Sequence, residues 1–298
     1  MQQKRYSSFA SPVSDRNVSL YKEMRERGEL LQGMKHKPKL GQNFLVDEGA
    51  RRAIVDALGD VSHRTVIEIG PGRGALTEIL ASRCQHLIAL ELDRELAPAL
   101  ADRLRDQPNV EIIEIDVLKA DFATLAPHGH TADVVGNLPY YITSDILLHL
   151  FVAASDGALT RAVVMMQREV ADRVAASPGS RNYGLLSATA QMHARVENLF
   201  TLPPAAFSPP PEVYSTVLRL DFSPRFEELQ VDPAGFDRFL KQSFAQKRKT
   251  LQNNLRTAGH NVHELTTAWP ASLPKDVRAE STPLETMAEI YRGLKDIN

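Results

Sequence analysis

One stretch predicts the fold class of this 298-residue chain: Thr65-Val66-Ile67-Glu68-Ile69-Gly70-Pro71-Gly72-Arg73-Gly74. Five residues that favour a β-strand run directly into a glycine-rich turn, and residues 75–82 then follow a helical pattern. Glycines at such a junction let the backbone pass close to a ligand at the carboxyl edge of a sheet. The stretch therefore predicts the first βα unit of an open α/β sheet, with a ligand site at its edge.

The alternation of strand and helix patterns continues beyond this unit. Short apolar runs predict strands at residues 65–69, 86–90, 110–115, 132–135, 162–166, 196–202 and 216–222. Helical patterns cover residues 75–82, 95–105, 143–151, 168–176 and 185–193. Such alternation is typical of βαβ units, so we expect an α/β fold whose parallel sheet is covered on both faces.

The two ends of the chain differ from this middle part. Residues 1–34 hold no sustained core pattern, and we expect a mobile or loosely docked arm there. Beyond Pro224 the pattern becomes helical, over residues 233–244, 246–258 and 284–295. We therefore expect three parts: the arm at 1–34, an α/β domain at 35–223 and a small helical domain at 224–298.

Composition narrows the class of protein. No apolar run approaches the roughly 20 residues that a membrane helix needs, and no signal sequence opens the chain, so we expect a cytoplasmic protein without membrane contact. Cys84 is the only cysteine, which predicts a buried, inert thiol and neither a disulfide nor a metal site. The formal net charge is −2, but residues 1–41 hold nine Lys/Arg against four acids. A basic region in a nearly neutral chain suggests a polyanionic partner.

Acidic residues follow the next two strands at the same edge. Glu91 stands roughly 20 residues beyond the glycine turn, where a carboxylate accepts hydrogen bonds from ribose hydroxyls, and Asp116 could accept one from an adenine amine. The glycine spacing also fits a dinucleotide site, so it does not separate nicotinamide from other adenosine-bearing cofactors. Pro71 lacks the N–H that a pyrophosphate would use, which mildly disfavours the dinucleotide.

The turn Asn137-Leu138-Pro139-Tyr140-Tyr141 follows the strand at 132–135. It sets an amide, a proline-fixed carbonyl and an aromatic ring side by side, which suits an unpaired base that needs edge acceptors and a stacking surface. An ordinary strand-end turn explains the same residues about as well, because Asn before a proline-containing turn is common.

Six ordered motifs favour one of these alternatives by resemblance. From about Lys35 to its end, the chain resembles the ribosomal RNA adenine dimethyltransferases, and the small-subunit (16S) type most closely. The motifs are Gly41-Gln42-Asn43-Phe44-Leu45, Glu68-Ile69-Gly70-Pro71-Gly72, Glu91-Leu92-Asp93, Asn137-Leu138-Pro139-Tyr140, Gln167-Arg168-Glu169-Val170-Ala171 and Phe207-Ser208-Pro209-Pro210-Pro211-Glu212-Val213-Tyr214-Ser215.

The resemblance implies a Rossmann-like class I methyltransferase sheet, mostly parallel with one antiparallel strand, and S-adenosyl-L-methionine as methyl donor. Residues implied to bind or shape the donor site are Gln42, Asn43, Leu45, Gly70, Gly72, Glu91, Leu92, Asp116 and Asn137. Residues implied to act on the adenine are Asn137, Leu138, Pro139, Tyr140 and Phe207, with Tyr140 and Phe207 stacking on its two faces. Small-subunit enzymes commonly have Asn where this chain has Tyr141, but the core of the motif remains.

The expected partner is small-subunit rRNA within a pre-ribosomal particle, bound by a monomer that uses no metal. Lys241, Lys247, Arg248 and Lys249 alternate with apolar residues, so we expect a helix that packs its apolar face and turns its basic side to phosphate. Three alternatives stay open: a large-subunit (23S) enzyme of the erythromycin-resistance type, a non-catalytic ribosome-assembly factor on the same fold, and a nicotinamide oxidoreductase.

Overall fold

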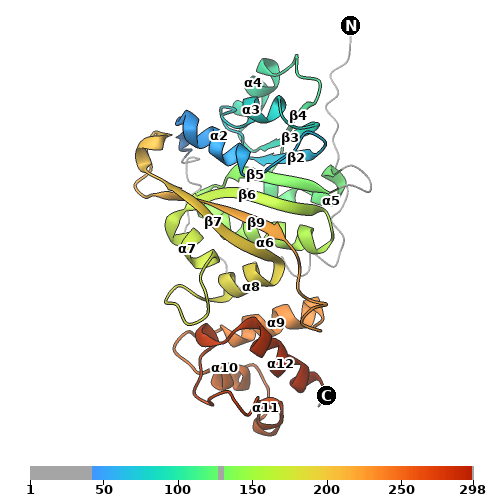
Figure 1. The fold of residues 1–298 in the computed structure, drawn as a ribbon, viewed down its shortest axis with the longest axis vertical. Helices are drawn as coiled ribbons and strands as arrows, with labels where there is room; N and C mark the ends of the chain where they lie inside the picture. Colours follow the sequence, from blue (N-terminus) through green and yellow to red (C-terminus); the bar gives the residue numbers. More distant parts are fainter. Residues whose placement is uncertain (1–41, 127–130, 297–298) are drawn as a thin grey trace. The chain divides into compact units, whose positions relative to one another are not determined.

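A seven-stranded sheet with the order β4-β3-β2-β5-β6-β9-β7 forms the centre of the protein (Figure 1). The structure is a computed structural model that describes residues 42–126 and 131–296. Neighbouring strands from β4 to β6 are parallel, whereas β9 runs antiparallel to both β6 and β7. The expected class I methyltransferase sheet with one antiparallel strand is confirmed, and that strand is β9, one place in from the edge.

The elements follow the chain in a simple order. The strands are β1 Phe44–Leu45, β2 Thr65–Ile69, β3 His86–Glu91, β4 Val110–Glu114, β5 Ala132–Asn137, β6 Leu159–Gln167, β7 Ala194–Leu202, β8 Phe207–Ser208 and β9 Ser215–Phe222. The helices are α2 Glu48–Asp56, α3 Thr77–Ala81, α4 Leu96–Arg103, α5 Phe122–Leu125, α6 Thr143–Ser155, α7 Arg168–Val174, α8 Leu185–His193, α9 Pro233–Ser243, α10 Leu251–Thr257, α11 Val262–Ala268 and α12 Leu284–Lys295. Short 3₁₀ turns lie at Val117–Lys119, Tyr140–Ile142, Pro204–Ala206 and Ala279–Ser281.

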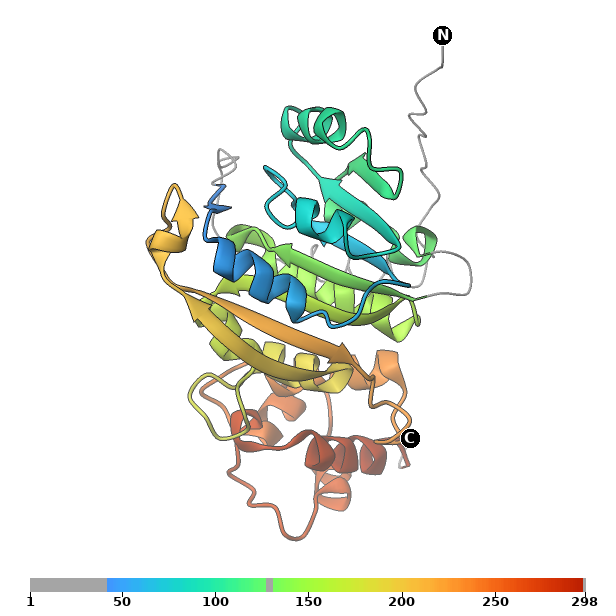
Figure 2. The ribbon, with the colours of Figure 1, turned by 45° about the horizontal axis from the view of Figure 1, so that its top comes forward.

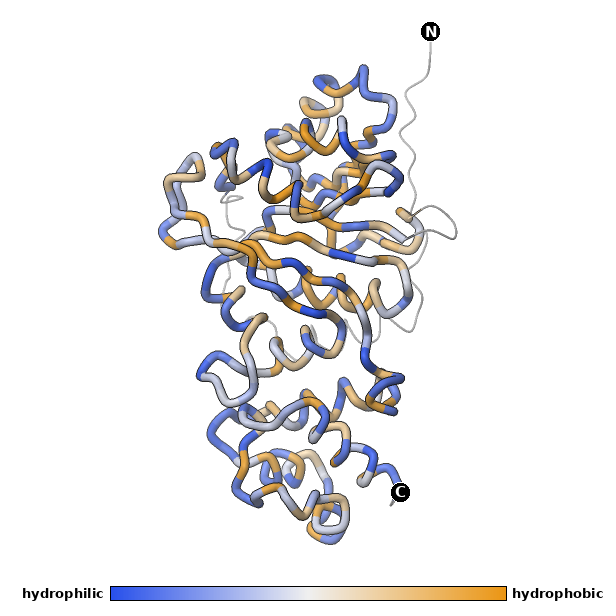
Figure 3. The backbone as a smooth tube through the Cα atoms, viewed as in Figure 1, coloured by the Kyte–Doolittle hydropathy of each residue, from blue (hydrophilic) through white to orange (hydrophobic). Residues whose placement is uncertain are grey.

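Both faces of the sheet are buried, and alternate residues of each strand serve different cores. Ile67 of β2 belongs to a core with α5, α6, α7 and α8, whereas its neighbour Val66 belongs to a core with α2 and α3. Figure 2 shows α2 crossing the near face of the sheet. Because both faces need apolar cover, the inner strands read as continuous apolar runs, visible as the hydrophobic centre of Figure 3.

The sequence-based prediction did not include helix α2 or the two-stranded sheet of β1 and β8. The side chain of Asp47 accepts the N–H of Ala50 and begins α2, a capping signal that the sequence does contain. Strand β1 pairs antiparallel with β8, and this pairing sets Leu45 opposite Phe207. Strands of two residues carry no periodicity, so local sequence could not have predicted this contact.

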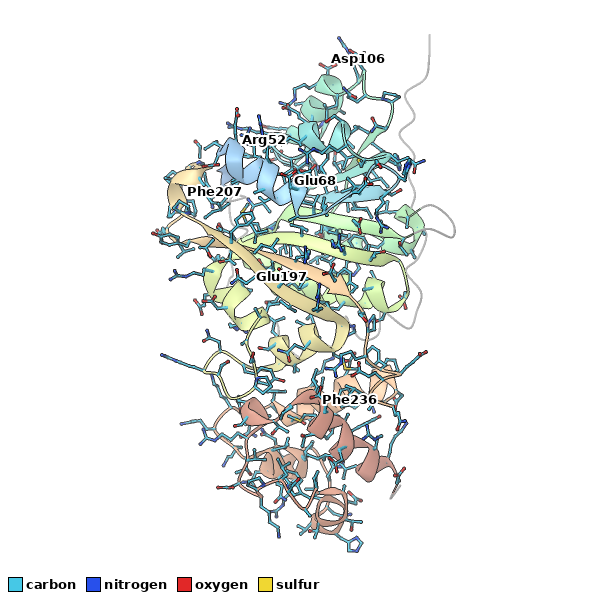
Figure 4. The ribbon with its side chains drawn as sticks, viewed as in Figure 1. Arg52, Glu68, Asp106, Glu197, Phe207 and Phe236 are labelled. Atoms are coloured by element: carbon cyan, nitrogen blue, oxygen red, sulfur yellow. The ribbon has the colours of Figure 1, made fainter. Side chains whose placement is uncertain are left out.

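The C-terminal helices α9–α12 build a third core around Phe236, labelled in Figure 4. Ala188 and Met192 of α8 belong to the same core, so it extends across the predicted boundary at residue 224. The boundaries of the α/β and helical domains stay predictions, and the arm at 1–34 lies outside the described residues.

The predicted helix at 246–258 is wrong at its start, because α10 begins only at Leu251. Thr250 accepts the N–H of Asn253 and caps α10, and the buried amide of Asn254 donates to the carbonyls of Ser243 and Gln246. These bonds hold residues 246–249 as a turn between α9 and α10. Lys247, Arg248 and Lys249 therefore lie in a turn and not on a helix.

We predict that Gly136→Ala destabilises the protein by about 1–3 kcal/mol, the usual cost of overpacking a core. Gly136 lies opposite Ile69 in the β2–β5 pairing, and an added Cβ would lie 2.5 Å from the Ile69 carbonyl oxygen. Urea unfolding measures the change. Gly184→Ala is the matched control, because a Cβ there meets no atom within 4 Å; equal stability of both variants would contradict the prediction.

Candidate functional site

The carboxyl ends of β2, β3 and β5 meet at one edge of the sheet, and the glycine turn lies there. Gly70 and Gly72 have positive φ angles of 64° and 57°, which side-chain-bearing residues rarely adopt. A Cβ at Gly72 would also lie only 3.1 Å from the ring of Phe44. Residues with a side chain are therefore disfavoured at Gly70 and Gly72.

Glu91 ties the glycine turn to the end of β3. Its Oε2 accepts the N–H of Gly72 at 2.9 Å, and its Oε1 accepts the N–H of Asp93 at 2.9 Å. A carboxylate has about four acceptor positions, so two remain for ligand hydroxyls. The N–H groups of Gly70 and Gly74 donate to the carbonyls of Leu90 and Pro71. With those amides committed and Pro71 lacking an N–H, the turn is poorly suited to cradle a pyrophosphate.

The segment at residues 42–45 lies against this turn. The Gln42 amide donates to Asp93 at 3.3 Å, and the ring of Phe44 lies beside Gly72 with the Arg73 guanidinium 4.3 Å from its centre. Leu45 is buried, and its carbonyl accepts two hydrogen bonds from the Arg51 side chain. Residues that are distant in sequence thus form one wall of the site.

Asn137, the last residue of β5, has a fixed amide orientation. Its Nδ2 donates to the carbonyl of Asn43 at 3.1 Å. Its Oδ1 is buried and has no hydrogen-bond partner among the described residues. An unpaired buried acceptor costs on the order of 1–3 kcal/mol, so such an atom is expected where a ligand supplies the donor.

The residues after Asn137 are held from two sides. Leu138 is buried, and its N–H donates to the carbonyl of Met165 at 2.9 Å. Tyr140 is half-buried, and its hydroxyl shares a 2.8 Å hydrogen bond with the Ser215 hydroxyl at the start of β9. Burial raises the pKa of Tyr140, and the Ser215 hydrogen bond opposes this shift. Between them, Pro139 accepts the Thr143 hydroxyl at its carbonyl. The turn is therefore rigid at both ends.

Phe207 lies in the core and not on a surface. It is 3% exposed, pairs with Leu45 and packs among the residues between α2 and the sheet (Figure 4). A base could reach its ring only after a shift of the loop at residues 203–214. In the structure Phe207 packs in the core, and its stacking on a base stays a prediction.

Three more predicted or notable residues surround the same edge. Asp116 uses Oδ1 to accept the N–H of Leu118, and its other oxygen has no partner among the described residues. Leu92 is 45% exposed beside Glu91, an apolar surface next to the acids. Burial raises the pKa of Tyr141, and the nearby Asp116 charge adds to the increase. Tyr141 therefore lies near the acid expected to meet an adenine.

Glu68 is a buried acid beneath the glycine turn that local sequence reasoning did not place in the site. Burial raises its pKa to about 8, the Thr77 hydroxyl opposes the shift, and the Glu91 charge adds to it. The carboxyl is therefore mainly neutral at pH 7. Other contributors missed from the sequence are Phe44, Asp93 and Ser215, whose contacts are long-range.

The four predicted basic residues lie elsewhere, in α9 and the turn that follows it. Lys247, Arg248 and Lys249 are exposed, and Lys241 is partly buried. The apolar residues in and around this stretch pack into the C-terminal core: Phe236, Phe239 and Leu251 are buried, and Phe244 is partly buried. The structure thus presents a basic turn on an apolar base, separate from the strand ends that hold Asn137.

Two further predictions concern the general class of protein. Cys84 is 7% exposed and its thiol donates to the Leu80 carbonyl, while burial raises its pKa to about 11, which confirms an inert thiol. The described part of the chain contains no group of three or more His, Cys, Asp and Glu side chains suited to a metal ion. Within residues 42–126 and 131–296, no helix has the length and apolar character needed to cross a membrane.

Comparison with known proteins identifies close relatives. Residues 33–296 match the family model described as ribosomal RNA adenine dimethylase. The chain is 60% identical over 263 residues to the ribosomal RNA small subunit methyltransferase A of Acidobacterium capsulatum, covering 88% of this chain and 92% of that protein. The protein of the same name from Koribacter versatilis is 51% identical, covering 87% and 94%.

Solved structures show the same fold. A dimethyladenosine transferase from Plasmodium falciparum superposes with a TM-score of 0.71 at 22% identity, covering 85% of this chain and 98% of that chain. The 23S rRNA methyltransferase ErmE gives a TM-score of 0.65 at 24% identity, covering 85% and 100%. At such identities the likeness concerns the fold alone.

We predict that Glu68→Gln removes one cause of the decrease in the free energy of unfolding as the pH rises. The pKa of about 8 in the folded protein lies above the ordinary value of 4.5 for this group. Below pH 4.5 both states hold the proton; between 4.5 and 8 only the unfolded state releases it. Stability should therefore fall with rising pH by about 1.4 kcal/mol per pH unit in this window, and Gln should abolish that slope.

Urea unfolding at pH 5, 7 and 9 measures this contribution. Glu111→Gln is the control, because Glu111 is an exposed carboxylate on β4. If the Glu68 and Glu111 variants showed the same dependence of unfolding free energy on pH, the buried carboxyl would not be the group that titrates.

Proposed function

Because the chain belongs to the ribosomal RNA adenine dimethylase family, we propose that it dimethylates the N6 amines of two adjacent adenosines near the 3′ end of small-subunit rRNA. The methyl donor would be S-adenosyl-L-methionine. The observation that carries the mechanism is the Oδ1 of Asn137 at the carboxyl edge of the sheet, which is buried and has no hydrogen-bond partner among the described residues. The substrate within a pre-ribosomal particle, the cytoplasmic location and the monomeric state remain predictions.

The residues at the strand ends fit the proposed donor. Glu91 retains acceptor capacity for ribose hydroxyls, and the second carboxylate oxygen of Asp116, which has no partner among the described residues, could accept a hydrogen bond from an adenine amine. Leu92 offers an apolar surface, while Gly70 and Gly72 keep the backbone bare. Gln42, Asn43 and Leu45 would form the facing wall. When bound, S-adenosylmethionine supplies an electrophilic methyl group.

The same arrangement disfavours a dinucleotide. The N–H groups of Gly70, Gly72 and Gly74 all donate within the protein, and Pro71 has none. A nicotinamide oxidoreductase would also leave the Asn137 oxygen unexplained. These two observations favour the methyl donor over the nicotinamide alternative.

Asn137 and Leu138 would act on the nucleophile. The exocyclic amine of adenine is a poor nucleophile, because its lone pair is delocalised into the ring. The Oδ1 of Asn137 and the carbonyl of Leu138 would accept the two amine hydrogens and favour a pyramidal nitrogen with its lone pair aimed at the methyl group. The hydrogen bond from Asn137 to Asn43 fixes which amide atom faces the substrate. No strong general base is needed, and positioning supplies much of the rate.

Tyr140 would hold the flipped base in place. Its ring is half-buried and its hydroxyl is anchored to Ser215, so it loses little freedom when a base stacks on it. Stacking of this kind contributes about 1–3 kcal/mol per base, which offsets much of the cost of unstacking. Pro139 fixes the backbone that carries both the acceptor and the ring. Phe207 would stack on the opposite face only after the loop shift described above.

The basic turn would bind phosphate away from the chemistry. Lys247, Arg248 and Lys249 are exposed, and the Asn254 amide holds the turn that carries them. Lys241 precedes them on α9. Phosphate contacts of this kind add affinity without reading sequence.

Mass spectrometry of adenosines after incubation with small-subunit particles and S-adenosylmethionine tests the function. We expect dimethyladenosine in the small-subunit RNA and none in large-subunit RNA treated in parallel. Modification of the large-subunit RNA alone would favour the erythromycin-resistance type instead.

We predict that Asn137→Ala lowers methylation by about 100-fold or more, the usual cost of removing one preorganised polar contact to a transition state. Single-turnover methylation of particles is the measurement. Asn198→Ala, an exposed asparagine on β7, is the control. Methylation by Asn137→Ala at the wild-type rate would overturn the mechanism. Lost methylation with retained particle binding would fit catalysis and leave room for an assembly role.

We predict that replacing Lys247, Arg248 and Lys249 together by Gln weakens particle binding and flattens its salt dependence. Each lost phosphate contact should reduce the slope of log K against log salt by roughly 0.7–0.9. Binding assays between 50 and 200 mM salt measure this. The double variant Arg83→Gln and Arg105→Gln, which removes exposed arginines near α3 and α4, should leave the slope unchanged. An unchanged slope in the triple variant would exclude the turn from RNA contact.

A further inference from the structure

Arg168 and Tyr214 form an exposed pair at the sheet edge where β6 ends and β9 begins. The Arg168 guanidinium lies 5.3 Å from the centre of the Tyr214 ring. Tyr214 is 47% exposed and its neighbour Val213 is 42% exposed, both large apolar side chains left in contact with solvent. Isolated exposed apolar residues are ordinary, but here two stand in succession and the ring of one lies under an arginine.

This surface is built and not loosely placed. The backbone N–H of Arg168 donates to the Tyr214 carbonyl at 3.0 Å, which joins the start of α7 to the loop before β9. Gln167 and Ser215, the adjoining residues, are paired in the β6–β9 ladder. The pair therefore rests on two strand ends and is held in position before any ligand arrives.

The surface also adjoins the residue proposed to stack on the target adenine. Ser215, which directly follows Tyr214, shares the 2.8 Å hydrogen bond with the Tyr140 hydroxyl. Tyr140 and Tyr214 are thus attached to the same anchor on β9. The end of β5, the end of β6 and the start of β9 lie at the same edge of the sheet, so the two tyrosines border the same edge.

The charge of the surface selects the kind of partner. No carboxylate among the described residues lies within ion-pair distance of the Arg168 guanidinium, which is exposed. An unpaired guanidinium plane above an aromatic ring suits an unpaired nucleobase with its phosphate, because both planes stack on bases and the cation attracts phosphate. An apolar peptide would leave that charge uncompensated.

We infer that Arg168 and Tyr214 form a second stacking site, which holds the nucleobase adjacent to the adenosine in the active site. This inference rests on the proposed function, in which the substrate presents two adjacent adenosines. While Asn137 and Tyr140 hold one, the other must lie within one nucleotide step. The second site gives it a defined place and sets the register of the strand.

The test combines protein variants with an altered substrate. Small-subunit particles carry either both adenosines or an abasic nucleotide in place of one, and methylation of the remaining adenosine is followed by mass spectrometry. Because stacking contributes about 1–3 kcal/mol per base, we expect Tyr214→Ala to lower kcat/KM about tenfold on intact particles. The abasic substitution should lower wild-type kcat/KM by a similar factor and have little further effect on Tyr214→Ala.

Conservative variants separate stacking from other roles. Tyr214→Phe keeps the ring and should retain wild-type kcat/KM, and all variants should bind S-adenosylmethionine with unchanged affinity. Arg168→Lys keeps the charge without the plane, so it should lose activity as Arg168→Ala does if the guanidinium stacks. Full activity of Arg168→Lys would show a phosphate contact alone.

The outcomes distinguish this inference from the proposed function. If wild-type protein methylates the particles and Tyr214→Ala has the same kcat/KM, the second site is wrong and the proposed function stands. The same conclusion follows if the reductions in kcat/KM from Tyr214→Ala and from the abasic substrate multiply, because independent effects would not share one stacking contact. If wild-type protein methylates neither adenosine of intact particles, both fall together.

Discussion

The hydrogen bond from the Asn137 amide to the Asn43 carbonyl is the interaction on which the site depends. An asparagine amide presents a donor or an acceptor according to which way it is turned, and only the acceptor can receive a hydrogen from an amine. The Asn43 carbonyl accepts from the donor, so the acceptor is the amide atom left available for a ligand. Its burial without a partner is a cost to the folded protein that a bound amine would remove.

Keeping Asn43 in place requires the segment before α2 to lie across the glycine turn. The β1–β8 pairing, the Phe44 ring on Gly72 and the Gln42–Asp93 contact all serve this placement. Beneath them, Glu91 fixes the turn through backbone N–H groups while Glu68 stays neutral because burial raises its pKa. Glu68 and Glu91 can therefore lie close together, because the neutral Glu68 places no second negative charge beside Glu91.

In the proposed function, recognition of RNA would be divided between surfaces of different chemistry. The turn at Lys247–Lys249 offers charge, which attracts phosphate over distance but carries no information about bases. Tyr140 and the proposed Arg168–Tyr214 pair offer flat rings at the strand ends, where contact is short-range and depends on an unstacked base. Such a separation would allow the protein to bind a large particle while the proposed chemistry stays at one edge of the sheet.

Local patterns and short spacings were enough to predict the α/β sheet, the glycine turn and the acids at the strand ends, and the family resemblance added the antiparallel strand. The sequence-based prediction began α10 too early, because Thr250 and Asn254 hold a turn before it. The sequence also contains capping residues for α2 and α11 that the prediction did not use. Tertiary structure alone decided the orientation of the Asn137 amide, the burial of Phe207 and the anchoring of Tyr140 by Ser215. Their partners are 94 residues away for Asn137 and 75 for Tyr140. No periodic pattern encodes a contact between single side chains that only the packing of the whole sheet brings together.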